Sequence, residues 1–192
     1  MLKEYYFYDA KCGDDVYEEY ELKGDAYKEL LRICEKYCKA VSFQVWPFDE
    51  WYEGMKAMDT VLMDAMEKFQ ISDTDKYKSR VGFCSMWHPR FAPVAITQRK
   101  YYKVCPELIE LLLRTTDDLF EWRRNSEFGR PEDPIFYRSD GSVFFSSVIH
   151  EGELKLTPRE GEDITSLLQL SVWWKDRRQH KRMYGTEADL ED

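Results

Sequence analysis

Two groups of residues in this 192-residue chain have the types that catalysis uses. His150 is followed by Glu151, and a histidine beside a carboxylate can act as a tuned base or as a metal ligand. Cys84 and His88 are four residues apart and could form a thiolate–imidazole pair. A structural role is the stronger interpretation for both groups. His150 and Glu151 are adjacent at a strand end and need not point to the same face, and a buried Cys84 would be unreactive. His150, Cys84 and His88 are therefore kept as outside candidates for catalysis.

Common catalytic motifs are absent from the sequence. It contains no G-x-G-x-x-G or G-x-x-x-x-G-K-[ST] phosphate loop, no C-x-x-C, no H-E-x-x-H and no G-x-S-x-G nucleophile elbow. No third metal ligand is spaced to join the candidate histidines. An enzyme of an unrecognised class stays open as an alternative, but no catalytic residue, metal site or cofactor is predicted.

An acidic, aromatic segment near the N-terminus has the composition of a protein-recognition surface. We call residues 14–20 the acidic segment, and its candidate binding residues are Asp14, Asp15, Tyr17, Glu18, Glu19 and Tyr20. Tyrosines beside carboxylates supply contact area and charge complementarity at protein interfaces. We expect these residues to bind a partner protein. The alternative is an edge strand whose charges discourage aggregation.

The net charge of −9 is unevenly distributed along the chain. Residues 1–75 contain 18 Asp and Glu against 9 Lys and Arg, whereas residues 76–192 contain 19 of each. This acidity argues against nucleic acid or an anionic membrane as a partner, and it is compatible with a basic protein. The basic stretch 175–182 is short and lacks interleaved aromatic residues, so it does not change that expectation. A plain solvated surface is the alternative.

The composition is that of a folded globular protein. Hydrophobic residues make up 43% of the chain and aromatic residues 16%. No apolar run approaches the ~20 residues of a membrane span, and the first residues lack the apolar core of a secretory signal. We therefore expect a cytoplasmic location. Cys34 and Cys38 are expected to be small buried hydrophobes on one helix face, since five irregularly spaced cysteines are not typical of a disulfide framework.

The strongest structural signal is a three-stranded meander in residues 133–158. Asp140-Gly141 is a favoured pair for a two-residue hairpin turn, and Glu151-Gly152 marks a second turn. Strict alternation along the middle strand places Phe145 on one face of the sheet and Phe144 on the other. The middle strand is therefore expected to be covered on both faces.

Apolar periodicity predicts the remaining elements. Strands are expected at 2–9, 16–22, 40–46 and 80–87, extended stretches at 94–97 and 101–104 that could form one bent strand, and helices at 25–38, 49–69, 106–124 and 163–170. The first two strands are expected to form a hairpin, and Asp25 to be the N-cap of the first helix. The fold class is α+β: a mostly antiparallel β-sheet with three or four helices packed on it. We expect a single domain over residues 1–184 and a frayed acidic tail over residues 185–192.

These observations favour a non-enzymatic protein-binding module over an enzyme. In size and composition the chain is similar to small acidic α+β proteins that bind another protein, such as immunity-type or phage-type inhibitors. A subunit of a larger assembly is a further alternative. Its contacts would be made by Trp173-Trp174 or by the methionine-rich helix predicted at 49–69.

Overall fold

The computed structural model describes residues 4–8, 22–45, 58–77, 98–122, 129–149, 152–171 and 173. Within them, six strands form one antiparallel sheet in the order β1-β6-β5-β4-β2-β3. The strands are β1 (Tyr5–Tyr8), β2 (Ala40–Val45), β3 (Gln98–Lys103), β4 (Glu132–Tyr137), β5 (Val143–Val148) and β6 (Glu153–Leu156). The helices are α1 (Asp25–Tyr37), α2 (Thr60–Glu67), α3 (Pro106–Thr115) and α4 (Thr165–Leu170), with 3-10 turns η2 (Asp75–Tyr77) and η3 (Leu119–Glu121). The predicted α+β fold is therefore confirmed.

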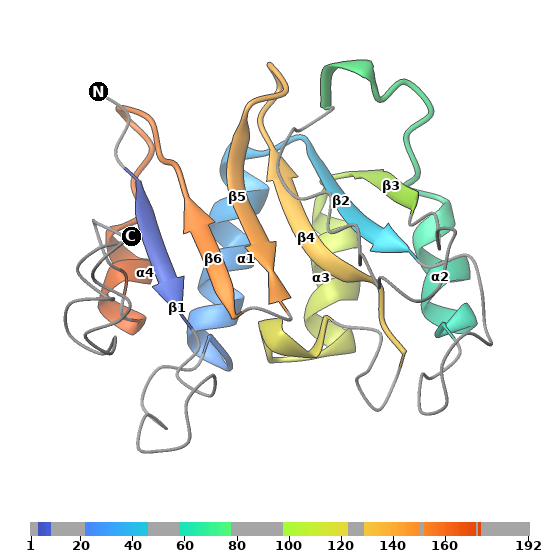
Figure 1. Ribbon diagram of the computed structural model, residues 1–192, viewed down its shortest axis with the longest axis horizontal. Helices are drawn as coiled ribbons and strands as arrows, with labels where there is room; N and C mark the ends of the chain where they lie inside the picture. Colours follow the sequence, from blue (N-terminus) through green and yellow to red (C-terminus); the bar gives the residue numbers. More distant parts are fainter. Residues whose placement is uncertain are drawn as a thin grey trace, which may run out of the picture.

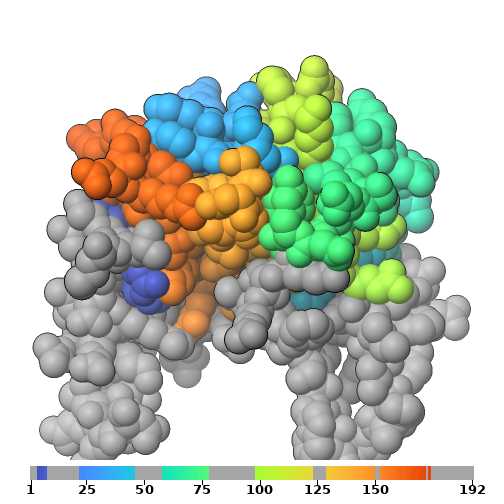
Figure 2. All heavy atoms as spheres, turned by 90° about the horizontal axis from the view of Figure 1, so that it is seen from above, coloured from blue at the N-terminus to red at the C-terminus, as the bar shows by residue number. Residues whose placement is uncertain are grey.

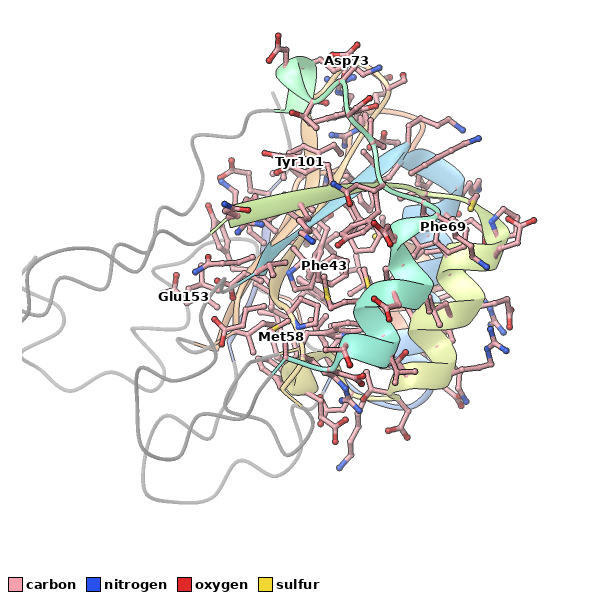
Figure 3. All side chains as sticks on the ribbon, turned by 90° about the vertical axis from the view of Figure 1, so that its right-hand side faces the viewer. Phe43, Met58, Phe69, Asp73, Tyr101 and Glu153 are labelled. Atoms are coloured by element: carbon pink, nitrogen blue, oxygen red, sulfur yellow. The ribbon has the colours of Figure 1, made fainter. Side chains whose placement is uncertain are left out.

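The helices pack on one face of the sheet, which we call the helix face. In Figure 1, α1 and α3 lie behind the strands, and Figure 3 shows α2 and α3 on the same side of the sheet. The largest fully buried side chains of this core are Phe7, Tyr27, Phe43, Tyr102, Trp122, Phe136, Phe144 and Phe145. Burying one such apolar side chain contributes roughly 1.5–3 kcal/mol to stability. The sheet and its helices therefore share one extended aromatic core.

Helix α1 forms because its apolar residues recur every three or four positions and face the sheet. Cys34 and Cys38 are fully buried in that stripe, which confirms that they are small core residues. Burial raises the pKa of the Cys34 thiol well above its ordinary value. Asp25 was wrongly predicted as the N-cap. Gly24 occupies the cap with a φ of 58°, and its N–H donates to the Asp117 carbonyl at 2.7 Å.

Strands β4, β5 and β6 are the predicted meander, but a bulge changes one detail of it. Phe136 pairs with Phe145 and Tyr137 pairs with Val143, so Phe144 has no opposite residue in β4. The extra residue bends the strand locally. Both Phe144 and Phe145 enter the core on the helix face. The prediction that they point to opposite faces was therefore wrong.

Over the described residues, two of the helices differ from the ranges that their apolar patterns predict; residues 49–57 of the predicted helix 49–69 lie outside the described chain. Helix α2 begins only after Asp59, an extended residue whose side chain accepts a hydrogen bond from the Leu62 N–H at 3.0 Å. Helix α3 ends before Thr116, whose hydroxyl accepts from the Asp118 N–H at 3.0 Å. The Asp59 bond is an N-cap that fixes where α2 begins, whereas the Thr116 bond competes with continuation of α3.

Some predicted elements fall on residues that the structure does not describe. These are the strand at 16–22 apart from Leu22, the strand at 80–87, and the tail 185–192. Strand β1 pairs with β6, with Tyr5 opposite Leu156, and β1 lies at the end of the described strand order. Among the described residues, none of the helices is long and apolar enough to cross a bilayer.

Candidate functional site

The residues that the sequence singles out for chemistry lie outside the described part of the chain. They are His150, Cys84 and His88, and, in the acidic segment, Asp14, Asp15, Tyr17, Glu18, Glu19 and Tyr20. The described chain fixes only the two flanks of the acidic segment. Strand β1 ends at Tyr8, and the chain resumes at buried Leu22, whose carbonyl accepts from the Leu119 N–H at 3.1 Å.

The alternative contact sites for a larger assembly are only partly described. Trp174 and Met55 lie outside the described residues, whereas Trp173 packs on Phe7 with their ring centroids 5.5 Å apart. Trp173 thus belongs to the edge of the chain's own core. In the parts of the chain that are described, no group of three or more His, Cys, Asp or Glu side chains could hold a metal ion.

The sheet face opposite the helices carries buried polar side chains, and we call it the polar face. Alternation along β2 directs Val41 and Phe43 to the core on the helix face and Ser42 and Gln44 to the polar face. Ser42 is 0% exposed and Gln44 is 3% exposed. Because buried polar groups cost free energy unless they are hydrogen-bonded, these residues need partners on the same face.

Arg99 of β3 supplies one such partner. Its Nη1 donates to the Ser42 hydroxyl at 3.0 Å and to the backbone carbonyl of Asp133 at 3.0 Å. Both acceptors are neutral oxygens. Burial lowers the pKa of Arg99, although nearby Tyr137, Asp133 and Tyr101 act in the opposite direction. The polar face therefore contains a half-buried guanidinium whose described hydrogen-bond acceptors are neutral oxygens.

Three tyrosines surround the position of Arg99. The Tyr137 hydroxyl lies 3.1 Å from the Ser42 hydroxyl, and Tyr101 follows Arg99 by two residues on the same face. Tyr77, from η2, packs on both, with ring centroids 5.7 Å from Tyr137 and 6.4 Å from Tyr101. Burial raises the pKa of Tyr137, so its phenol is neutral at pH 7. We call Ser42, Tyr77, Arg99, Tyr101 and Tyr137 the Arg99 cluster.

Asp133 orients the backbone that Arg99 binds. Its φ is 51°, in the left-handed region that residues other than glycine rarely adopt. The Asp133 side chain accepts from the Ile149 N–H at 2.7 Å, and the Ser147 hydroxyl donates to the Pro134 carbonyl at 2.9 Å. These bonds to β5 and its end hold the strained backbone of β4 in place, where the register between β2 and β4 shifts. Strain of this kind persists where surrounding structure enforces it, and it is common at ligand sites.

Arg138, which unlike Arg99 is buried, has a different environment. Arg138 forms a bidentate ion pair with Glu162, with Nε–Oε1 and Nη2–Oε2 distances of 2.6 and 2.5 Å. Its Nη2 also donates to the Thr157 carbonyl and its Nη1 to the Val143 carbonyl. Glu162 compensates the positive charge of Arg138, and all three guanidinium nitrogens donate hydrogen bonds. Arg138 is therefore a structural residue that joins the β4–β5 turn to the loop after β6.

An open groove of about 530 Å³ lies between residues 68–73 and the start of α3. Phe69 and Asp73, labelled in Figure 3, lie in its first wall, and Lys103, Cys105 and Glu107 line the other. The side chains that line the groove include both basic and acidic residues. It therefore indicates no particular ligand.

Sequence reasoning missed the Arg99 cluster. Its members come from positions 42, 77, 99, 101 and 137, and only the pairing of β2 with β3 and β4 brings them together. The single local signal was the strand predicted at 40–46, in which Ser42 and Gln44 alternate with apolar residues. No protein-family model, no curated protein and no solved structure matches this chain. The function of the chain must therefore be inferred from its own residues and their geometry.

Proposed function

We propose that the protein is a non-enzymatic binding protein that engages a basic partner protein through the acidic segment, as an immunity-type or phage-type inhibitor would. The observation that carries this proposal is the placement of charge. The whole net charge of −9 arises in residues 1–75, where acidic residues outnumber basic ones by two to one. Clustered charge of one sign steers an oppositely charged partner into contact.

The described structure supports this proposal at the flanks of the acidic segment. On one side, β1 is hydrogen-bonded to β6, with Phe7 fully buried. On the other, Leu22 is fully buried, and Leu22 and Gly24 are bonded to the backbone around η3. Residues 9–21, which include the acidic segment, are therefore bounded by Tyr8 and Leu22, two residues held to the core. A fixed base lowers the ordering cost that a binding segment must overcome. Cytoplasmic location, expected from the sequence, stays a prediction.

The experiment is affinity capture from the native host followed by mass spectrometry, with two charge-reversed variants. Glu18→Lys/Glu19→Lys changes the acidic segment. Glu110→Lys/Glu160→Lys changes two exposed glutamates outside residues 1–75 and alters the net charge equally. The proposal predicts one stoichiometric basic protein bound by the unmodified chain and by the control variant, and lost from the segment variant. Equal recovery with both variants would contradict it.

A further inference from the structure

The two ends of the acidic segment lie at unequal distances along the chain from described residues. Tyr20 comes two residues before Leu22, so their Cα atoms are at most ~7 Å apart. Asp14, at the other end, comes six residues after Tyr8 and can lie up to about 20 Å from it. The structure that holds Leu22 therefore restricts the position of the acidic segment more strongly than strand β1 does.

Leu22 and Gly24 are bonded to residues 116–121, which join α3 to η3 and which we call the α3–η3 turn. The Leu22 carbonyl accepts from the Leu119 N–H at 3.1 Å, and the Gly24 N–H donates to the Asp117 carbonyl at 2.7 Å. Both leucines are buried in the core. The C-terminal flank of the acidic segment is thus fixed by two backbone hydrogen bonds and by burial.

A buried polar network holds the α3–η3 turn itself. The Thr116 hydroxyl donates to the Glu121 carboxylate at 2.6 Å and accepts from the Asp118 N–H at 3.0 Å. Arg130 donates to the same carboxylate and, through Nη2, to the Thr115 carbonyl at 2.9 Å. Thr116 and Arg130 are both buried. Because satisfied buried networks of this kind rigidify the local structure, the turn presents its backbone to the flank in one defined position.

We propose that the α3–η3 turn, held by Thr116 and Arg130, positions the acidic segment for its basic partner. This inference rests on the proposed function, since it concerns how that same segment is presented. A binding segment whose end is already fixed loses less conformational freedom on association. The turn therefore raises affinity for the partner by positioning, without adding charge.

Amide hydrogen exchange of the free protein tests whether the turn holds the flank. Thr116→Val removes the hydroxyl and keeps the branched shape. Thr115→Val is the matched control, because the Thr115 hydroxyl donates to the Leu111 carbonyl within α3. We expect Thr116→Val to speed exchange of the Gly24 amide about tenfold relative to the amides of β2, which is the effect of losing one hydrogen bond. The control should leave that ratio near the native value.

Two insertions test the role of the flank in binding. Two glycines between Glu21 and Leu22 lengthen the short link from two residues to four, and the same insertion between Ala10 and Lys11 lengthens the long link from six to eight. Both insertions keep the net charge. Because the entropy of a flexible link scales with the logarithm of its length, we expect affinity for the captured partner to fall about threefold with the first insertion and about 1.5-fold with the second.

The outcomes separate this inference from the proposed function. The inference is overturned if the Gly24 amide exchanges equally in Thr116→Val and Thr115→Val, or if the two insertions weaken partner binding equally. Failure of the proposed function shows separately, as no captured partner or as equal recovery with the two charge-reversed variants. In that case the inference falls with it, even where the exchange comparison holds.

Discussion

At the scale of single residues, two arginines of the same fold have different roles. Arg138 donates through its three nitrogens and is paired with Glu162, so its removal would take a donor away from the Glu162 carboxylate and from the Thr157 and Val143 carbonyls. Arg99 donates to two neutral oxygens through one nitrogen. The contrast indicates that Arg138 stabilises the fold through a compensated ion pair, whereas the described partners of Arg99 are neutral.

The Arg138–Glu162 ion pair predicts a pH dependence of stability. Burial raises the pKa of Glu162, but hydrogen bonds from Arg138 and from the Arg159 N–H outweigh it, so the pKa lies below its ordinary value of 4.5. A carboxyl with a lowered folded pKa stabilises the protein above its unfolded pKa and loses that contribution as the pH falls through the folded pKa.

Glu162→Gln should therefore lower the free energy of unfolding at pH 7 by about 1–3 kcal/mol. The difference from the unmodified protein should shrink as the pH falls below 4.5, because Glu162 then becomes protonated. Urea denaturation at several pH values measures both effects. Glu160→Gln, in the same loop and exposed, is the control and should change little. A loss that stays constant down to about pH 3 would contradict the ion-pair assignment.

Asp133 gives a second prediction at this scale. Asp133→Ala removes the acceptor of the Ile149 N–H and keeps a left-handed backbone that alanine disfavours, so it should destabilise the protein by about 1–3 kcal/mol. Asp133→Asn retains an acceptor oxygen and tolerates the positive φ, so its loss should be clearly smaller. Chemical denaturation compares the two. Equal losses of stability in the two variants would show that the Asp133 side-chain acceptor does not hold this part of β4.

At the scale of elements, local sequence patterns identified α1 and the meander because their signals are short-range. The apolar stripe of α1 and the Asp140-Gly141 turn act within a few residues of the chain. The bulge at Phe144 was not predictable, since it depends on how β5 fits β4. The ends of α2 and α3 were missed for a related reason. Asp59 caps the start of α2, and Thr116 ends α3. Both act through side-chain bonds to backbone, which the pattern of apolar residues does not reveal.

The β4–β5 turn also contacts a distant element, and this contact gives the prediction at this scale. Figure 2 shows the green segment that ends in η2 lying against the orange turn, where a Cβ at position 141 would collide with the Lys76 carbonyl. Gly141→Ala should therefore destabilise the protein through both its φ of 82° and the collision. Gly161→Ala is the matched control, because φ is 84° there and the site of the added Cβ is open.

Thermal or urea unfolding of the two variants separates these effects. Gly161→Ala should cost about 1 kcal/mol from the positive φ alone. Gly141→Ala should cost at least about 1 kcal/mol more, because a packed contact must move. The Tyr77 ring sits next to Lys76 on the polar face, so the same variant should also disturb the Arg99 cluster. Equal losses in the two variants would mean that η2 is not packed against the turn.

At the scale of the whole molecule, the sequence predicted the fold class, whereas the sites that it proposed lie outside the described residues and stay predictions. Charge counts and aromatic clusters along the chain identify the acidic segment without any knowledge of the fold. The Arg99 cluster is the opposite case, since Ser42, Arg99 and Tyr137 lie on three different strands and are brought together only by sheet pairing. A candidate surface made by one segment can be proposed from the sequence, whereas a cluster assembled across strands cannot.

The uneven charge distribution also predicts how binding depends on salt. If the acidity of residues 1–75 steers a basic partner, association should slow as the ionic strength rises, while dissociation changes less. The Glu18→Lys/Glu19→Lys variant should associate more slowly at low salt and show a weaker salt dependence. The Glu110→Lys/Glu160→Lys variant should remain close to the unmodified protein.

The measurement that tests the central claim most directly is the association rate of the captured partner with these three proteins at low and at physiological ionic strength. We expect the segment variant to associate about tenfold more slowly than the control variant at low salt, with the difference reduced at higher salt. Association rates that are the same for the two variants at low salt would contradict binding through the acidic segment.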